Sequence, residues 1–299
     1  MASEFRSRLV LGAVPANPAL LTHSLFDRSY REPKGSAIDE FLRRVEAANR
    51  LAPRPMDFDA FQGQLVLLGV VAAVESYIRT LFRRLIAVDK TSQEAVEHMD
   101  VSFGAAMHLS KDLMPEAILE RISFISYSNI SESIKTLLAV KGALTPELVT
   151  AIEDYVRVCQ LRHCAVHRFG KLGASNAIQL GLEEHKALLE KPLLLNYRAL
   201  QDAIAIATSF VKTLNNFLFN ALLSRIPLDQ WNGVYSDDRE LFGRYYLIFA
   251  DHVSVRRTPA AGKVYREFRK QQLTWCGANV QTYSRNQTPR SIRRTRRPK

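Results

Sequence analysis

The stretch TPELVTAIEDYVRVCQLRHCAVHRFG, residues 145–170, predicts a long helix whose two ends are both marked in the sequence. It begins with a capping hydroxyl, a proline suited to the first helical position and an acid suited to the positive end of the helix dipole. The side expected to be buried then follows helical spacing, with Leu148, Ile152, Val156, Cys159, His163 and Val166. We expect the helix to end near Phe169, because Gly170 readily adopts the left-handed conformation that stops a helix.

Apolar stripes predict two further long helices, one on each side of this stretch in the chain. The first covers about residues 57–88, and its stripe follows a period close to 3.6 residues. The second covers about residues 196–224 and is apolar over a wide arc, as expected for a central bundle helix. Pro227 ends it. The sequence therefore predicts an all-α helical bundle.

Shorter elements are expected in the rest of the chain. Ser36 is suited to cap a short helix, and residues 112–125 and 129–140 give the clearest helical patterns between the long helices. Gly142 is expected to close the second of these. Residues 177–182 alternate enough to predict a short strand after the helix of residues 145–170.

These patterns divide the chain into four expected segments. Residues 1–56 form an irregular N-terminal arm and a short helix, and residues 57–226 form the helical bundle. Residues 227–283 contain aromatic and basic side chains without a clear period, and we expect an extension of uncertain fold. Residues 284–299 form a basic tail with too few apolar groups to fold alone.

The positive charge is concentrated at the end of the chain. Of the net charge of +11, seven positive charges lie in residues 284–299, which contain no acidic residue, so the rest of the chain carries +4. Such a tail can bind the phosphates of a nucleic acid without sequence preference. The expected phosphate contacts are Arg293, Arg294, Arg296 and Arg297. A tail that only keeps the protein soluble is the alternative.

Neither a membrane span nor a disulfide framework is expected from the sequence. The longest apolar run, residues 65–74, is about half the length that a transmembrane helix needs. The N-terminus has only a brief apolar patch, too weak for a secretory signal. The three cysteines are odd in number and lack disulfide spacing, so a reducing cytoplasm is the expected location.

An arginine and a histidine lie five residues apart in the last turns of the helix of residues 145–170. Arg162 can bind a phosphate through its planar guanidinium, and His167 can move a proton near neutral pH. This spacing arises readily by chance, and Arg157 and His163 form an overlapping match, so the helical context carries the argument. Five residues turn a helix by about 500°, which separates the two side chains by about 140°. Two copies related by a two-fold axis would bring both pairs into one cleft.

This arrangement resembles the HEPN superfamily of small helical bundles over roughly residues 57–225. Members carry an Arg-x4–6-His motif late in a core helix, with a polar residue directly after the arginine. Here the motif residues are Arg162, His163 and His167, followed by Arg168-Phe169-Gly170. The usual polar residue is asparagine or aspartate, so His163 departs from the pattern. The resemblance implies a metal-independent endoribonuclease of toxin–antitoxin or phage-defence systems, although some members only bind nucleotides or proteins.

The resemblance also implies roles for individual residues. His167 would transfer protons, Arg162 would hold the scissile phosphate, and the product would end in a 2′,3′-cyclic phosphate. His163 and Glu75 would be auxiliary, and Arg168 would contact RNA. No cofactor is expected. The expected partners are RNA, further copies in a homodimer or higher even oligomer, and an inhibitor or antitoxin protein, with no membrane.

Several alternatives stay open at this level. His163 can be a core histidine, Arg168 can cap carbonyl groups at the helix end, and Glu75 can form a helical ion pair with Arg79. Cys159, His163 and His167 share one helical face and are types of residue that bind zinc, but a fourth ligand is lacking, and no metal site is expected. An enzyme is favoured, and the alternative function is a non-catalytic dimeric adaptor that binds RNA or a protein.

Overall fold

A computed structural model describes residues 9, 11–13, 15–255, 258–275 and 277. The chain divides into two units, Met1–Lys34 and Gly35–Lys299. In the described part of the first unit, a 3₁₀ helix at Thr22–Leu25 interrupts an otherwise irregular, exposed chain. The second unit begins just before the first α-helix, so this helix belongs with the bundle.

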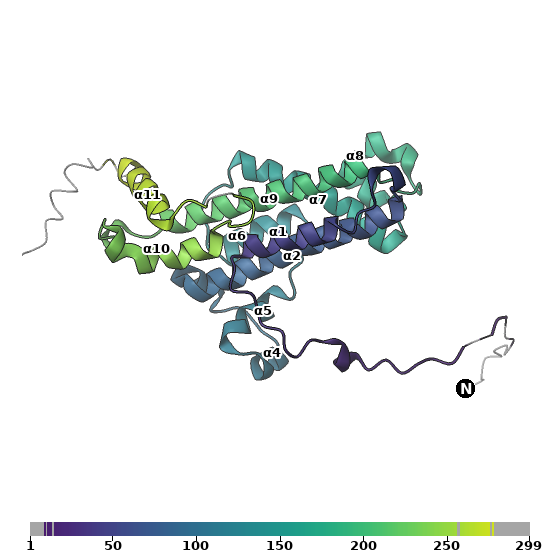
Figure 1. The fold of residues 1–299 in the computed structure, drawn as a ribbon, viewed down its shortest axis with the longest axis horizontal. Helices are drawn as coiled ribbons and strands as arrows, with labels where there is room; N and C mark the ends of the chain where they lie inside the picture. The colour runs from purple at the N-terminus through teal and green to yellow at the C-terminus, as the bar shows by residue number, and fades with distance from the viewer. Residues whose placement is uncertain (1–8, 10, 14, 256–257, 276, 278–299) are drawn as a thin grey trace, which may run out of the picture. The chain divides into compact units, whose positions relative to one another are not determined.

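The second unit is a bundle built around four helices that run side by side (Figure 1). They are α1 (Ala37–Asn49), α2 (Ala60–Val88), α7 (Pro146–Arg168) and α9 (Tyr197–Ser224). The shorter helices are α3 (Lys90–Val96), α4 (Phe103–His108), α5 (Met114–Leu119), α6 (Tyr127–Thr136), α8 (Ala174–His185), α10 (Tyr235–Phe249) and α11 (Ala261–Trp275). Every element of the described residues is helical apart from one isolated bridge, which confirms the predicted all-α class.

The predicted helix starts are confirmed where a capping side chain marks them. The side chains of Ser36, Thr145 and Asn196 each accept a hydrogen bond from a backbone N–H in the first turn of α1, α7 and α9. Such bonds satisfy donors that the helix itself leaves unpaired. Helix α2 starts slightly later than expected, because Asp59 caps it by accepting a hydrogen bond from Gln62 N at 2.8 Å.

The strand predicted for residues 177–182 is wrong, because these residues lie inside α8. Asn176 and Ala177 are buried, and the side chain of Asn176 donates to Gln160 Oε1 on α7 at 2.8 Å. The helix therefore packs on α7 through Asn176 and Ala177, whereas Ile178 and Leu182 of the alternating pattern are exposed. Gly181, at φ +109°, kinks α8 near its middle.

The helices between α2 and α7 are shorter than predicted. The helical pattern of residues 112–125 gives a 3₁₀ turn followed by α5, which ends at Leu119. Helix α6 ends at Thr136 rather than at residue 140, and the chain turns at Ala139, which has φ +49°. Gly142, at φ +86°, therefore lies beyond the helix end that it was expected to close.

A buried carboxylate joins the end of α2 to α9 and α10. Asp89 accepts a hydrogen bond from Ser92 N at 2.7 Å and another from the Tyr245 hydroxyl at 2.9 Å, and it forms an ion pair with Arg225. Arg225 also donates to Leu138 O at 2.5 Å. Burial, together with the Asp89 charge, raises the pKa of Tyr245, so this hydroxyl stays protonated as a donor. The network therefore joins the start of α3, the segment after α6, the end of α9 and the middle of α10.

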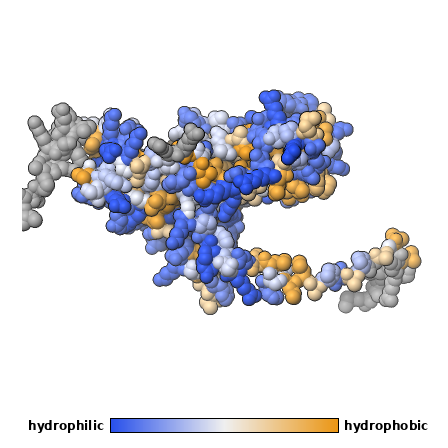
Figure 2. Space-filling model, viewed as in Figure 1, coloured by the Kyte–Doolittle hydropathy of each residue, from blue (hydrophilic) through white to orange (hydrophobic). Residues whose placement is uncertain are grey.

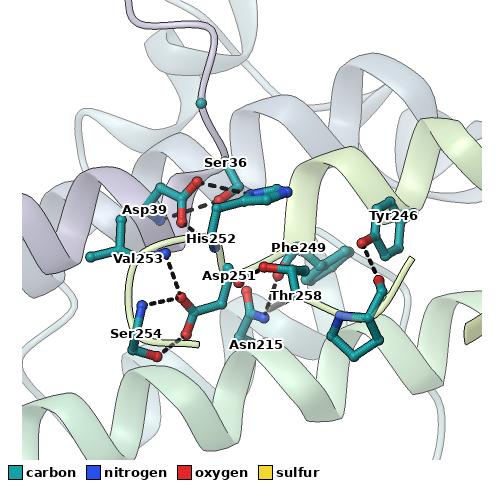
Figure 3. Close-up of polar contacts among 12 residues, drawn as sticks. Ser36, Asp39, Asn215, Tyr246, Phe249, Asp251, His252, Val253, Ser254 and Thr258 are labelled. Carbon is teal, nitrogen blue, oxygen red and sulfur yellow. Dashed lines mark hydrogen bonds and ion pairs between the residues drawn. The ribbon is translucent and has the colours of Figure 1, made fainter. Parts of the chain in front are cut away.

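A second polar network fastens the segment after α10 to the bundle (Figure 3). The backbone N–H of His252 donates to buried Asp39 at 2.7 Å, and His252 Nδ1 lies 3.1 Å from the same carboxylate. Asn215 on α9 donates to Phe249 O at 2.9 Å, which ties down the last residue of α10. Residues 227–275, which had no clear sequence pattern, therefore add helices that pack on the bundle.

Helix α2 is long and apolar enough to span a membrane by length and composition, and it is the one such helix in the described residues. However, 61% of its most apolar 18-residue window is buried by the rest of the protein. Its buried face includes Leu67, Val70, Val74, Ile78, Leu81 and Leu85. A long apolar helix that is largely buried in this way forms part of the core of the bundle.

Asp89→Asn is expected to lower the free energy of unfolding by about 3 kcal/mol, because it leaves the Arg225 guanidinium largely buried without its counter-charge. Urea denaturation followed by circular dichroism measures this loss. The matched control is Asp202→Asn on α9, whose pair with Arg198 is solvent-exposed and should contribute less than about 1 kcal/mol. Equal effects of the two substitutions would contradict the role given to Asp89.

Candidate functional site

The packing of α7 determines which of its side chains reach the surface. Tyr155 is fully buried and its ring stacks on Phe210 of α9, with centroids 4.7 Å apart and planes 13° apart. The buried residues of the helix are Leu148, Ile152, Tyr155, Val158, Cys159 and Cys164. The predicted burial of Val166 is therefore wrong, since 43% of this residue is exposed. The large Tyr155 ring, which the predicted stripe omitted, sets the rotation of the helix.

The two histidines of the motif lie against each other on the accessible side of α7. The ring centroids of His163 and His167 are 4.5 Å apart, with an interplanar angle of 48°. His163 is partly buried and His167 is exposed. Burial lowers the pKa of His163, and the charges of His167 and Arg162 lower it further. The His163 ring is therefore neutral near pH 7 and can accept a hydrogen bond.

Arg162 is half-buried directly beside this histidine pair. Its positive charge acts on three neighbours along α7. It adds to the lowering of the pKa of His163, and it partly opposes the rise that burial causes in the pKa of Cys159 and of Tyr155. Its charge thus acts on both the interior and the accessible side of the helix. Arg162 therefore lies near His163, and His163 contacts His167, within the last two turns of α7.

Cys159 lies on the interior side of the same helix and is separated from this chemistry. The residue is buried, and burial raises the pKa of its thiol to about 12, with a further contribution from the negative charge of Glu75. It is a neutral thiol, and zinc binds the thiolate. Cys159 and His167 face different surroundings, and the described residues contain no group of three or more His, Cys, Asp or Glu side chains placed to hold a metal ion. The zinc alternative gains no support.

Glu75 extends from α2 toward the turn between α5 and α6. Its Oε1 accepts hydrogen bonds from Phe124 N at 3.2 Å and from the Ser123 hydroxyl at 3.4 Å. Its charge raises the pKa of both Tyr155 and Cys159, so it lies near the middle of α7. The expected alternative, an ion pair with Arg79, is replaced by a pair between Arg79 and Glu116 at 3.5 Å. The contacts of Glu75 position a turn, and its auxiliary role in chemistry stays a prediction.

Arg168 is tied to the segment that follows α8. Its Nη2 lies 2.5 Å from Glu190 Oε1, and both side chains are substantially exposed. An exposed pair of this kind is weak enough for a phosphate to compete with the carboxylate. Its role in RNA contact stays a prediction. The other predicted RNA contacts, Arg293, Arg294, Arg296 and Arg297, lie outside the described residues.

The end of α7 differs from the sequence prediction in one informative detail. Phe169, rather than Gly170, is the first residue in the left-handed region, with φ +51° and ψ +43°, and Gly170 follows at φ +88°. Gly170 N donates to Cys164 O at 3.0 Å, and Gly170 O accepts from Leu193 N at 2.9 Å. A side chain at Gly170 would press against Gln64, whose Nε2 donates to Leu193 O at 3.0 Å. The turn is thus fixed on both sides.

An exposed aromatic pair next to the motif was not predicted from the sequence. The ring of Phe169 stacks on Phe61 of α2, with centroids 5.2 Å apart and planes 30° apart. Phe61 precedes the strong part of the α2 stripe, and nothing in its local sequence indicates contact with a residue 108 positions later. Figure 2 shows further hydrophobic side chains at the surface at this end of the bundle, where α8 lies.

No family model, curated protein or solved structure matches this chain. Its function is therefore inferred from its own residues and their geometry.

His163 is expected to titrate below the value of about 6.5 that is usual for histidine, and Arg162→Ala should move its pKa upward. Removal of a nearby positive charge makes the imidazolium easier to form, which gives the sign of the change. NMR titration of the histidine ring signals measures both values. Arg157→Ala, on the same helix but largely exposed and paired with Asp154, is the control and should leave the pKa of His163 unchanged. A His163 pKa at or above 6.5 would contradict the described burial.

Proposed function

We propose that this protein is a metal-independent endoribonuclease of the HEPN type, acting as a toxin or anti-phage effector in the cytoplasm. The observation that carries the proposal is the contact between His163 and His167 on α7, with half-buried Arg162 close enough to lower the pKa of His163. These residues combine a fixed cation, a neutral imidazole and an exposed imidazole within two helical turns. These are the groups that cleavage of RNA by its own 2′-hydroxyl requires.

Each group has a separate task in this reaction. An imidazole removes the proton from the ribose 2′-oxygen, which attacks the adjacent phosphorus, and the bond from phosphorus to the 5′-oxygen breaks. A protonated group gives a proton to the leaving 5′-oxygen, and the other product carries a 2′,3′-cyclic phosphate. We assign proton transfer to His167 because it is exposed, and phosphate binding to Arg162 because its guanidinium presents forked donors. Neutral His163 adds no second charge beside Arg162 and orients it or the phosphate.

A second copy of the chain belongs to the proposal. One exposed histidine supplies one proton-transfer group, whereas the reaction uses a base and an acid on opposite sides of the phosphate. His167 of a second subunit, placed across a two-fold axis, would supply the other group. A closed two-fold interface is the commonest way for identical chains to assemble.

The alternative is a dimeric adaptor that binds RNA or a protein without cleaving it. It would depend on the basic residues 284–299 more than on the α7 motif, since charge alone supports non-specific binding. Deletion of these residues should then weaken RNA binding more than Arg162→Ala does. Under the nuclease proposal, both variants can bind, and only the motif variant loses cleavage.

Arg162→Ala and His167→Ala are each expected to reduce RNA cleavage by at least about 100-fold, because each removes a group that acts in the transition state. Cleavage of a labelled RNA by the full chain, with the 2′,3′-cyclic end identified by mass spectrometry, measures the effect. A single 2′-deoxyribose at the cut position should block cleavage there, since it removes the nucleophile.

Two variants serve as matched controls. Arg157→Ala removes an exposed arginine from the same helix, and His108→Ala removes an exposed histidine from α4, so both should retain full cleavage. Thermal unfolding should give the same melting temperature for all four variants. Full activity of Arg162→Ala and His167→Ala would show that the site is assigned wrongly.

A further inference from the structure

Phe169 is an exposed aromatic residue held in an unfavourable backbone conformation. Its side chain is 79% exposed, and its φ of +51° lies in the left-handed region, which a residue with a Cβ adopts at a cost of about 1 kcal/mol. Exposure of a large apolar ring gives no folding energy in return. Asparagine or glycine would fit this position with less strain. The combination points to a role for the ring outside folding.

The ring of Phe169 is supported from behind. Phe61, itself 45% exposed, stacks on it with a centroid distance of 5.2 Å, in a nearly parallel arrangement. The helix-end hydrogen bonds of Gly170 fix the backbone just beyond the ring. One face of Phe169 is therefore covered by Phe61, and the exposure of the residue leaves surface for another flat group to contact.

The surroundings of this ring favour a negatively charged ligand. Phe169 follows His167 by two residues, so their Cα atoms lie at most about 7 Å apart. Arg168 precedes Phe169 directly and Lys171 follows it two residues later, and both side chains are exposed. Among the described residues, Glu190 is the acid that forms an ion pair with Arg168. Arg162 lies two turns earlier on the same helix. A flat ring next to phosphate-binding groups is the arrangement by which proteins hold single-stranded nucleic acids.

We propose that Phe169, backed by Phe61, is a stacking platform for an unpaired base of the RNA next to the phosphate held by Arg162. The inference rests on the proposed ribonuclease function and names its substrate class, which is single-stranded RNA. A base in a duplex is covered on both faces by its neighbours and cannot stack on the ring, whereas a base in a loop or single strand can. Stacking on an aromatic side chain does not depend on which base is present, so the platform selects for strandedness rather than for sequence.

The experiment measures binding in a full-length chain that carries His167→Ala, so that the RNA is not cut. The probe is a short single-stranded RNA that contains one 2-aminopurine, whose fluorescence falls when the base stacks. Phe169→Leu keeps an apolar side chain of similar size and the same backbone strain but removes the ring. We expect it to weaken binding about tenfold and to remove the fluorescence decrease, and Phe169→Trp to restore both.

Phe103→Leu is the matched control. Phe103 is 80% exposed at the start of α4, and α4 lies away from the end of the bundle formed by α7 and α8 (Figure 1). This substitution should leave RNA binding unchanged. The same RNA annealed to its complement should bind with equal affinity to the parent and to Phe169→Leu, because a duplex offers no free base.

The outcomes separate this inference from the function on which it rests. Equal binding and equal fluorescence of the parent and Phe169→Leu, while the wild-type chain still cleaves RNA, would overturn the platform alone. Normal stacking in a wild-type chain that does not cleave RNA would overturn the nuclease proposal alone. Loss of binding accompanied by a smaller oligomer in sedimentation would also overturn the platform, since Phe169 would then contact a second copy of the chain.

Discussion

The site depends on how α7 packs against α2 and α9. The Tyr155 ring lies flat on Phe210, with Ile152 and Cys159 buried on the same side of the helix. Because each residue turns a helix by 100°, a rotation of α7 by one position would change which of its side chains face the core and which face solvent. The aromatic contact therefore holds the functional side of the helix toward solvent, although none of its atoms takes part in the proposed reaction.

Helix α2 supports the rest of the bundle in two ways. Its apolar face fills the core, and its polar side chains organise turns that have no regular structure of their own. Arg79 donates to the carbonyls of Leu119 and Ile122, and Glu75 accepts from Ser123 and Phe124. Buried carbonyl and amide groups need such partners, since an unpaired group costs about 1–3 kcal/mol. The same helix ends at Asp89, where three further segments are joined.

Helix α7 buries the side chains of Tyr155 and Cys159 and leaves those of its histidines accessible. Burial raises the pKa of Tyr155 and of Cys159, so both remain neutral within the core. The imidazoles of His163 and His167 follow Cys159 on the same helix, where the surface becomes partly exposed at His163 and exposed at His167. The chemistry that α7 offers is therefore proton transfer beside a guanidinium. A thiolate nucleophile or a thiolate metal ligand is disfavoured by the burial of Cys159.

The sequence by itself determined the all-α class, the long helices and the spacing of Arg162, His163 and His167. These are local properties, because capping by Thr145 and Asn196 and a 3.6-residue apolar period depend on residues close in the chain. Tertiary structure decided which side of α7 is buried, why residues 177–182 are helical, and where residues 227–275 pack. It also decided that Phe61 and Phe169 stack. It further decided that Glu75 accepts hydrogen bonds from the turn before α6 instead of forming an ion pair with Arg79. Each of these depends on contacts between residues far apart in sequence, which no local pattern records.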